Sequence, residues 1–139
     1  MSERNFSMRL NCTYEGTANT IASLEVEHKV DDQWQQLDLG VTTPGFDIFV
    51  YAVFACQHMY FRVNCAERGL LLKSAAGSIF IAAGQDWSME SLQVHFSGQL
   101  GSGQASTGDI DYIVARMKQC PVSRNLREIP DYQSKVTLA

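Results

Sequence analysis

The longest apolar segment of the chain, residues 48–63, most constrains how this sequence can fold. Only three of its sixteen residues, Gln57, His58 and Arg62, are strongly polar. A helix that is apolar on nearly every side is buried in a folded protein. The segment is also too short and too interrupted to cross a membrane. It therefore predicts a long central helix, over about 44–68, that is packed inside the protein.

The residues that flank this segment have the types expected at helix ends. Thr43 and Pro44 predict an N-cap followed by the first helical position. Asp47 lies in the first turn, where a carboxylate is favoured by the positive end of the helix dipole. Arg68 and Gly69 predict the end of the helix, because a cation favours the last turn and glycine accepts the left-handed conformation that terminates many helices.

Alternating apolar residues and turn signals predict strands and a second helix around the central helix. The expected elements are an N-terminal β-meander at about 5–40, a β-hairpin at about 70–100, a helix with a CPVS motif at about 107–128 and a closing strand at about 134–139. This order is typical of an α+β protein. A chain of 139 residues without an internal linker indicates a single domain, 1–139.

Three local signals refine these elements. Gly77 interrupts an apolar strand and predicts a bend or a bulge. The glycine-rich segment 101–108 predicts a flexible loop, because its spacing fits neither GxGxxG nor the P-loop. Pro121 predicts a new helical turn with Cys120 at its N-cap, since proline is favoured at the first helical position.

Composition and charge exclude several classes of protein. A hydrophobic content of 45% is ample for a core, and a net charge of −4 without a basic block excludes a nucleic-acid footprint. The first ten residues, MSERNFSMRL, lack the apolar core of a signal peptide, so we expect a cytoplasmic protein. In a reducing compartment, four cysteines indicate redox or metal chemistry rather than a disulfide scaffold. No CxxC or HxxxH spacing is present, so we expect neither a metal nor a bound cofactor.

Two of the cysteines are candidates for that redox chemistry. Cys56 lies in the middle of the central helix, and Cys120 lies near the other end of the chain. Cys65 points away from Cys56 on a helix, so any partner of Cys56 must come from another element. Cys12 and Cys65 are expected in the core, because cysteine is among the most often buried residue types. His58 also points away from Cys56 and is expected to be structural.

Three short segments give these cysteines a recognisable context. They are Ala55-Cys56 in the central helix, Ala66-Glu67-Arg68-Gly69-Leu70 at its end, and Cys120-Pro121-Val122-Ser123 after the second helix, with residues 57–119 between the two cysteines. Together they resemble the OsmC/Ohr family over about residues 40–139. Members of this family carry a reactive cysteine in a long central helix and a second cysteine in a CPVS-type motif.

The resemblance implies an OsmC-like α+β fold, with antiparallel sheets wrapped around long central helices in an intertwined homodimer. It also implies a thiol-dependent peroxidase that reduces organic hydroperoxides and, as a further substrate, hydrogen peroxide. By the resemblance, Cys56 would attack the peroxide and become a sulfenic acid, and Cys120 would resolve this acid as a disulfide. The electron donor would be a dithiol, either lipoyl-type or a small thiol.

The groups that activate the reactive cysteine in the peroxidase members have no clear counterpart here. Those groups are an arginine from the N-terminal strands and a glutamate that precedes the cysteine. Arg9 and Arg124 are candidate cations, and Asp47 is the nearest carboxylate. Without a nearby cation, an apolar helix would raise the pKa of Cys56 and disfavour its thiolate.

Two alternatives to the peroxidase therefore stay open. One is a non-catalytic OsmC-like dimer that binds a small apolar ligand, and the other is a redox sensor. A purely structural interaction protein would leave the cysteine pair unreactive. Contact between the two sulfurs and an arginine over Cys56 would favour the enzyme, whereas an apolar cavity without an arginine would favour the binding protein.

Overall fold

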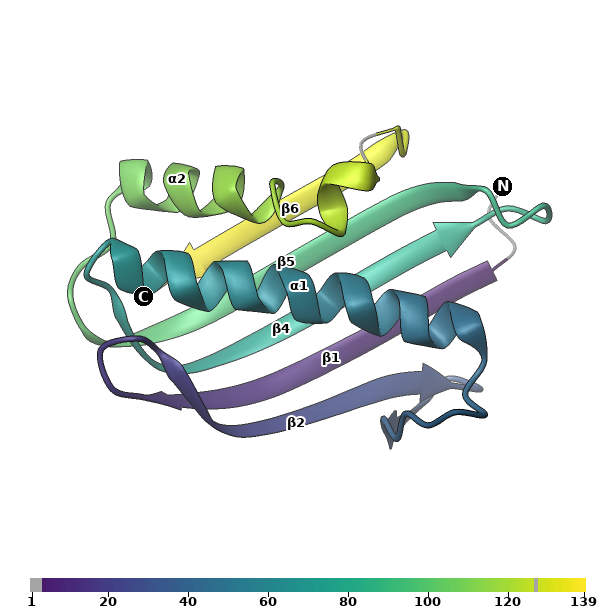
Figure 1. The fold of residues 1–139 in the computed structure, drawn as a ribbon, viewed down its shortest axis with the longest axis horizontal. Coiled ribbons are helices and arrows are strands. Elements are labelled where there is room, and N and C mark those ends of the chain that lie inside the picture. Colours follow the sequence, from purple (N-terminus) through teal and green to yellow (C-terminus); the bar gives the residue numbers. More distant parts are fainter. Residues whose placement is uncertain (1–3, 127) are drawn as a thin grey trace.

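A six-stranded sheet with helices on one of its faces forms the described part of the chain (Figure 1). The computed structural model describes residues 4–126 and 128–139. The strands are β1 (Arg4–Glu15), β2 (Thr20–Val30), β3 (Gln33–Gln36), β4 (Leu71–Ala83), β5 (Met89–Ser102) and β6 (Asp131–Leu138). The helices are α1 (Gly45–Glu67), α2 (Thr107–Met117) and the short 3-10 turn η1 (Ser123–Asn125). The predicted α+β class is confirmed.

The sheet is mixed rather than wholly antiparallel, which corrects the prediction. Its strand order is β3-β2-β1-β4-β5-β6, and β6 pairs with β5 in parallel. The physical reason is the connection between them, because parallel neighbours need a crossover and α2 supplies it on one face of the sheet. The last strand also begins earlier than predicted, at Asp131, which pairs with Ser91 and accepts a hydrogen bond from its hydroxyl at 3.0 Å.

Helix α1 runs diagonally across the sheet, and α2 lies beside it on the same face (Figure 1). The buried side of α1 carries large apolar residues. The rings of Phe54 and Phe61 stack on the ring of Phe96 in β5, with centroids 5.8 and 4.9 Å away. Burying one such ring contributes roughly 2–3 kcal/mol. Within residues 4–126 and 128–139, no helix has the length and apolar character needed to cross a membrane.

Gly77 lies in a regular part of β4, so the predicted bend or bulge at this residue is wrong. It pairs with Leu10 of β1 on one side and Phe96 of β5 on the other, and the irregularities of the β4–β5 ladder lie elsewhere. A Cβ atom on Gly77 would approach the Phe96 ring to 2.6 Å. Glycine is therefore needed for space under the ring on which α1 packs.

The start of α1 differs from the prediction by one residue. Pro44 is the N-cap, with φ −52° and ψ 135°, and the first helical residue is Gly45. Thr43 does not cap the helix; its hydroxyl accepts a hydrogen bond from the Gly40 N–H at 2.8 Å and closes the preceding loop. The extended ψ of Pro44 explains the difference, because an N-cap residue is not yet helical.

Helix α1 ends at the Arg68-Gly69 pair, as predicted, although Arg68 is the C-cap and does not lie in the last turn; the end is a Schellman motif. Gly69 has φ +72°, and its N–H donates to the Ala66 carbonyl at 3.0 Å. The Leu70 N–H donates to the Cys65 carbonyl at 2.9 Å. These two bonds satisfy carbonyls that the helix end would otherwise leave free, and glycine tolerates the left-handed conformation that they need.

A buried polar pair joins α1 to β1. The Tyr14 hydroxyl and the His58 Nε2 lie 2.7 Å apart, and the His58 side chain is only 4% exposed. Burial, with a smaller contribution from Arg62, lowers the pKa of His58 to about 4. This arrangement confirms the structural role predicted for His58, because a buried neutral imidazole that is hydrogen bonded to tyrosine fills the core.

This pair should make the fold sensitive to acid. The folded pKa of His58 lies below the ordinary value of 6.5, so protons bind the unfolded chain first as the pH falls from about 6.5 to about 4. The free energy of unfolding should therefore drop by roughly 3 kcal/mol across that window. Urea unfolding at a series of pH values measures this loss.

The matched control is His58→Gln, whose side chain retains an acceptor for Tyr14 but does not titrate. This variant should lose most of the difference between pH 6.5 and pH 4. An equally steep loss in wild type and variant would show that other groups are responsible.

Candidate functional site

Cys56 and Cys120, the two predicted site residues, lie together. Cys56 comes from the middle of α1, and Cys120 comes from the turn that follows α2. Their thiols are within hydrogen-bond reach of each other, and both are reduced in the structure. Cys12 and Cys65 are buried in the core, as predicted. The packing of α2 beside α1 thus brings two sulfurs that are distant in sequence into contact.

Cys120 lies two residues before Val122, which is the N-cap of η1, so the helical turn begins later than the position of Cys120 before Pro121 predicted. The Cys120 Sγ accepts a hydrogen bond from the Ser123 N–H at 3.2 Å, and its carbonyl accepts one from the Arg124 N–H at 3.0 Å. The Cys120 side chain is 0% exposed. The hydrogen bond from Ser123 and the complete burial of the side chain hold the Cys120 sulfur in place.

The helix predicted over 107–128 is shorter than expected. Helix α2 ends at Met117, and among the residues described after it only Ser123–Asn125 form a further helical turn. Pro121 accounts for the break, because proline lacks an N–H donor and disfavours a helical residue before it. The break lets the chain turn back, so that the side chains of Cys120 and Ser123 face α1.

Gln57 is absent from the predicted site residues, yet it forms the centre of this contact. Its Nε2 donates to the Met117 carbonyl at 2.8 Å, to the Ser123 hydroxyl, and to the Cys120 Sγ at 3.6 Å. The side chain is completely buried. A sequence signal existed, since Gln57 is a strongly polar residue in an apolar helix and directly follows Cys56.

Cys56 is only partly covered, unlike Cys120. Burial, followed by the hydrogen bond with the Cys120 thiol, raises the pKa of Cys56 to about 11, while the Val122 N–H acts in the opposite direction. The Cys56 sulfur is therefore the accessible member of the pair, but its surroundings favour the neutral thiol.

The candidate cations do not activate Cys56. Arg9 forms an ion pair with Glu27 at 2.7 Å and stacks over Trp34 at 4.3 Å. Its side chain thus lies on the face of the sheet opposite α1, because the neighbouring Met8 faces the core. The prediction that Arg9 could activate Cys56 is therefore wrong for contacts within one chain. Arg124 is exposed and is not among the groups that shift the pKa of Cys56.

Asp47 does not take the place of the missing glutamate either. It lies nine residues before Cys56 on α1, which places it about 180° around the helix axis. The two side chains therefore point in opposite directions. The chain supplies the cysteine pair of a redox site without an acidic group beside Cys56 on the same helix.

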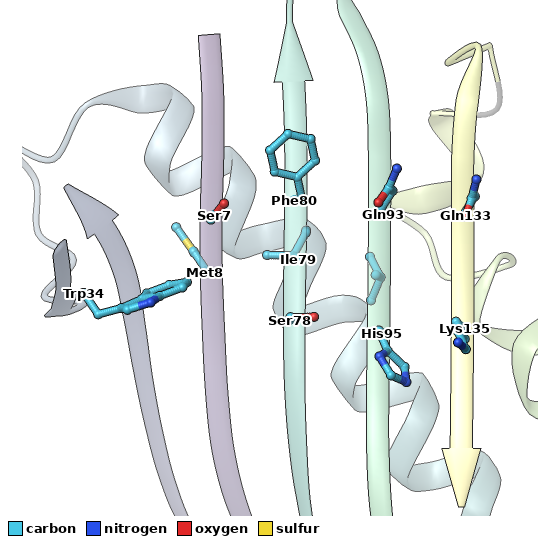
Figure 2. A pocket seen from close by; sticks show the side chains of 11 residues that line it. Ser7, Met8, Trp34, Ser78, Ile79, Phe80, Gln93, His95, Gln133 and Lys135 are labelled. Carbon is cyan, nitrogen blue, oxygen red and sulfur yellow. The ribbon is translucent and has the colours of Figure 1, made fainter. Parts of the chain in front are cut away.

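A hollow of about 380 Å³ lies on the outer face of the sheet, far from this pair (Figure 2). Figure 2 views this face of the sheet, with α1 behind the strands. Its ionisable groups are His95 and Lys135, and burial together with the Lys135 charge lowers the pKa of His95. Serine, glutamine and aromatic side chains make up most of the remaining lining. These groups do not form a nucleophile with an adjacent base, so the hollow offers no alternative site for nucleophilic chemistry.

Solved structures share this arrangement of sheet and helices. An OsmC-like protein from Mycoplasma pneumoniae is 13% identical and matches with a TM-score of 0.53 over 83% of this chain and 87% of its own. An OsmC-like hydroperoxide resistance protein from Jannaschia sp. CCS1 is 12% identical, with a TM-score of 0.56 over 91% and 89%. The chain has the OsmC-like fold.

A hypothetical protein from Aquifex aeolicus VF5 also matches this chain, with 9% identity and a TM-score of 0.55 over 100% of this chain and 96% of its own. No protein-family model and no curated protein matches the sequence. The predicted resemblance is therefore confirmed at the level of the fold. The activity of this OsmC-like chain has to be argued from its own cysteines.

The contact between the two sulfurs leads to a first chemical test of the site. We expect the thiol oxidant diamide to join Cys56 and Cys120 within one chain, because they touch, whereas Cys12 and Cys65 are buried in the core. Alkylation followed by mass mapping of non-reduced peptides identifies the bridge. Cys56→Ser and Cys120→Ser are the matched controls and should form no internal bridge. A bridge that involves Cys12 or Cys65 would contradict the assignment.

Proposed function

We propose that this OsmC-like protein is a thiol-dependent peroxidase that reduces organic hydroperoxides and also accepts hydrogen peroxide. The observation that carries the proposal is the contact between a partly exposed cysteine, Cys56, and a buried one, Cys120. Such a pair is the minimum set for peroxide reduction by thiols. The fold shared with a protein named for hydroperoxide resistance supports the same conclusion.

In the first step, the Cys56 thiolate attacks one oxygen of the hydroperoxide. The O–O bond breaks, Cys56 takes up the terminal OH as a sulfenic acid, and the other oxygen leaves as an alkoxide, which takes from water the proton that Cys56 had released and becomes an alcohol. In the second step, the Cys120 sulfur attacks the Cys56 sulfur. An S–S bond forms, the S–O bond breaks, and the oxygen leaves with the Cys120 proton as water. A dithiol, lipoyl-type or a small thiol, then restores both cysteines and is itself oxidised to a disulfide.

The geometry suits the second step because Cys120 is already in contact with Cys56. A sulfenic acid formed at Cys56 needs no movement of α1 to meet its partner. Rapid resolution protects the sulfenic acid from further oxidation to sulfinic acid.

The redox sensor and the apolar binding protein are the second candidates, and one observation favours them. Burial raises the pKa of Cys56 to about 11, and no cation counteracts this effect among the groups that shift it. Only about 10⁻⁴ of the Cys56 side chains would be thiolate at pH 7. A sensor or a binding protein tolerates such slow chemistry, whereas a peroxidase must compensate for it.

Turnover of cumene hydroperoxide with dihydrolipoamide tests the peroxidase. We expect wild type to consume peroxide at a rate that rises about tenfold per pH unit between pH 7 and pH 9, because the thiolate fraction of Cys56 rises in that proportion below its pKa. Cys56→Ser should abolish turnover. Cys120→Ser should accumulate a sulfenic acid, detectable with dimedone. Consumption no faster than that by free dithiol in all three proteins would refute the proposal.

We propose that the protein is a homodimer in which the α1 helices of two copies pack together. Ile48, Met59 and Val63 form an apolar stripe on the outer side of α1, with exposed fractions of 41%, 51% and 38%. Large apolar side chains aligned along a helix mark an interaction surface. Cys56 lies at the edge of this stripe, about 60° around the helix from Met59.

Two charged residues placed on the apolar stripe of α1 should separate the two copies. We expect Met59→Glu combined with Val63→Glu to sediment as a monomer, because two buried carboxylates would face each other across the interface. Analytical ultracentrifugation measures the change. Gln99→Glu, at an exposed position of β5, is the matched control and should leave the mass unaltered. A wild-type protein that remains monomeric at high concentration would refute the dimer.

A further inference from the structure

We propose that Gln57 is a positioning residue that holds Cys120 against Cys56 and stabilises it as the leaving thiolate when their disulfide is reduced. The inference rests on the proposed function for the biological role of the disulfide. It stands on the hydrogen bonds of Gln57, the burial of Cys120 and the partial exposure of Cys56.

The orientation of the Gln57 amide follows from its neighbours. The Met117 carbonyl can only accept a hydrogen bond, so the nitrogen of the amide, and not its oxygen, must face it at 2.8 Å. The same nitrogen faces the Ser123 hydroxyl and the Cys120 sulfur. The amide oxygen is buried and has no hydrogen-bond partner among the described residues. Gln57 is therefore placed for its N–H groups, since leaving its oxygen unpaired costs stability.

The nitrogen of Gln57 has two hydrogens but three acceptors within reach. One hydrogen is committed to the Met117 carbonyl. The Ser123 hydroxyl and the Cys120 sulfur must share the second. A thiolate is a stronger acceptor than a sulfur in a disulfide. The second N–H therefore donates its hydrogen bond mainly to Cys120 when that sulfur is a thiolate. It donates mainly to the Ser123 hydroxyl when the disulfide is formed.

Access decides which sulfur becomes negative. Cys120 is 0% exposed, whereas Cys56 is partly exposed, so a dithiol can reach only the Cys56 side of the disulfide. Its thiolate forms a bond with the Cys56 sulfur, the Cys56–Cys120 bond breaks, and the electron pair leaves on Cys120. The second thiol of the reductant then attacks the mixed disulfide and releases Cys56. Disulfide exchange is faster when the leaving thiolate is better stabilised.

The test uses the disulfide without any peroxide. Full-length protein is oxidised with diamide, freed of the oxidant, and reduced with excess dihydrolipoamide between pH 5.5 and pH 9. Alkylation at successive times gives the rate. We expect Gln57→Met, which keeps the length of the side chain but has no N–H, to be reduced about tenfold more slowly than wild type at pH 7. Ser123→Ala frees the shared hydrogen for the sulfur and should be reduced no more slowly than wild type.

A second variant separates stabilisation of the thiolate from simple packing. Gln57→Glu retains the shape of the side chain but places a carboxyl beside the leaving sulfur. It should be reduced slowly at high pH, where the carboxylate repels the thiolate, and should recover toward the wild-type rate as the carboxyl gains its proton. Circular dichroism and thermal melting establish that the variants are folded. If Gln57→Met is unfolded, the pH profile of Gln57→Glu alone decides the matter.

The outcomes distinguish this inference from the proposed function. Equal slowing of Gln57→Met and Ser123→Ala, or a flat pH difference between Gln57→Glu and wild type, would overturn the role of Gln57. Failure of diamide to join Cys56 and Cys120 would overturn it as well. If the disulfide forms and the Gln57 effects are found while peroxide is not consumed, the inference holds and the peroxidase does not.

Discussion

The packing of α1 on the ring of Phe96 is the contact on which the rest of the structure depends. Phe54 and Phe61 stack on this ring. Gly77, on the neighbouring strand, has no side chain and so leaves room for the Phe96 ring. These contacts fix the rotation of α1 about its own axis. With that rotation fixed, the large aromatic side of the helix faces the sheet, and Cys56 faces away from it.

The same rotation gives two adjacent residues different tasks. Consecutive side chains on a helix diverge by about 100°. Cys56 therefore reaches a partly open surface, while Gln57 reaches the buried turn that carries Cys120 and Ser123. The site combines one accessible sulfur and one protected sulfur, and the helix that exposes the first also holds the second. A change in how α1 sits on the sheet would disturb both at once.

The sequence predicted the helices, most of the strands and the cysteine pair. It did not predict the contacts between distant elements that place them. The long, mostly apolar segment predicted α1, and the CPVS motif together with Cys56 predicted two sulfurs that do meet. The parallel pairing of β6 depends on a distant partner, which no local pattern encodes. Gln57 escaped prediction because its acceptors lie on another element. The outward position of Arg9 could have been foreseen, since it alternates with Met8 in a strand whose other face is buried.

The fit between Gly77 and Phe96 also limits how sequences with this structure can change. The two residues are direct partners on neighbouring strands, and the space that one leaves is filled by the other. A side chain at Gly77 becomes acceptable only after the ring at Phe96 has been exchanged for a smaller residue, and the reverse order leaves a cavity under α1. Across related sequences, the two positions should therefore vary together, as a pair whose intermediate steps are disfavoured.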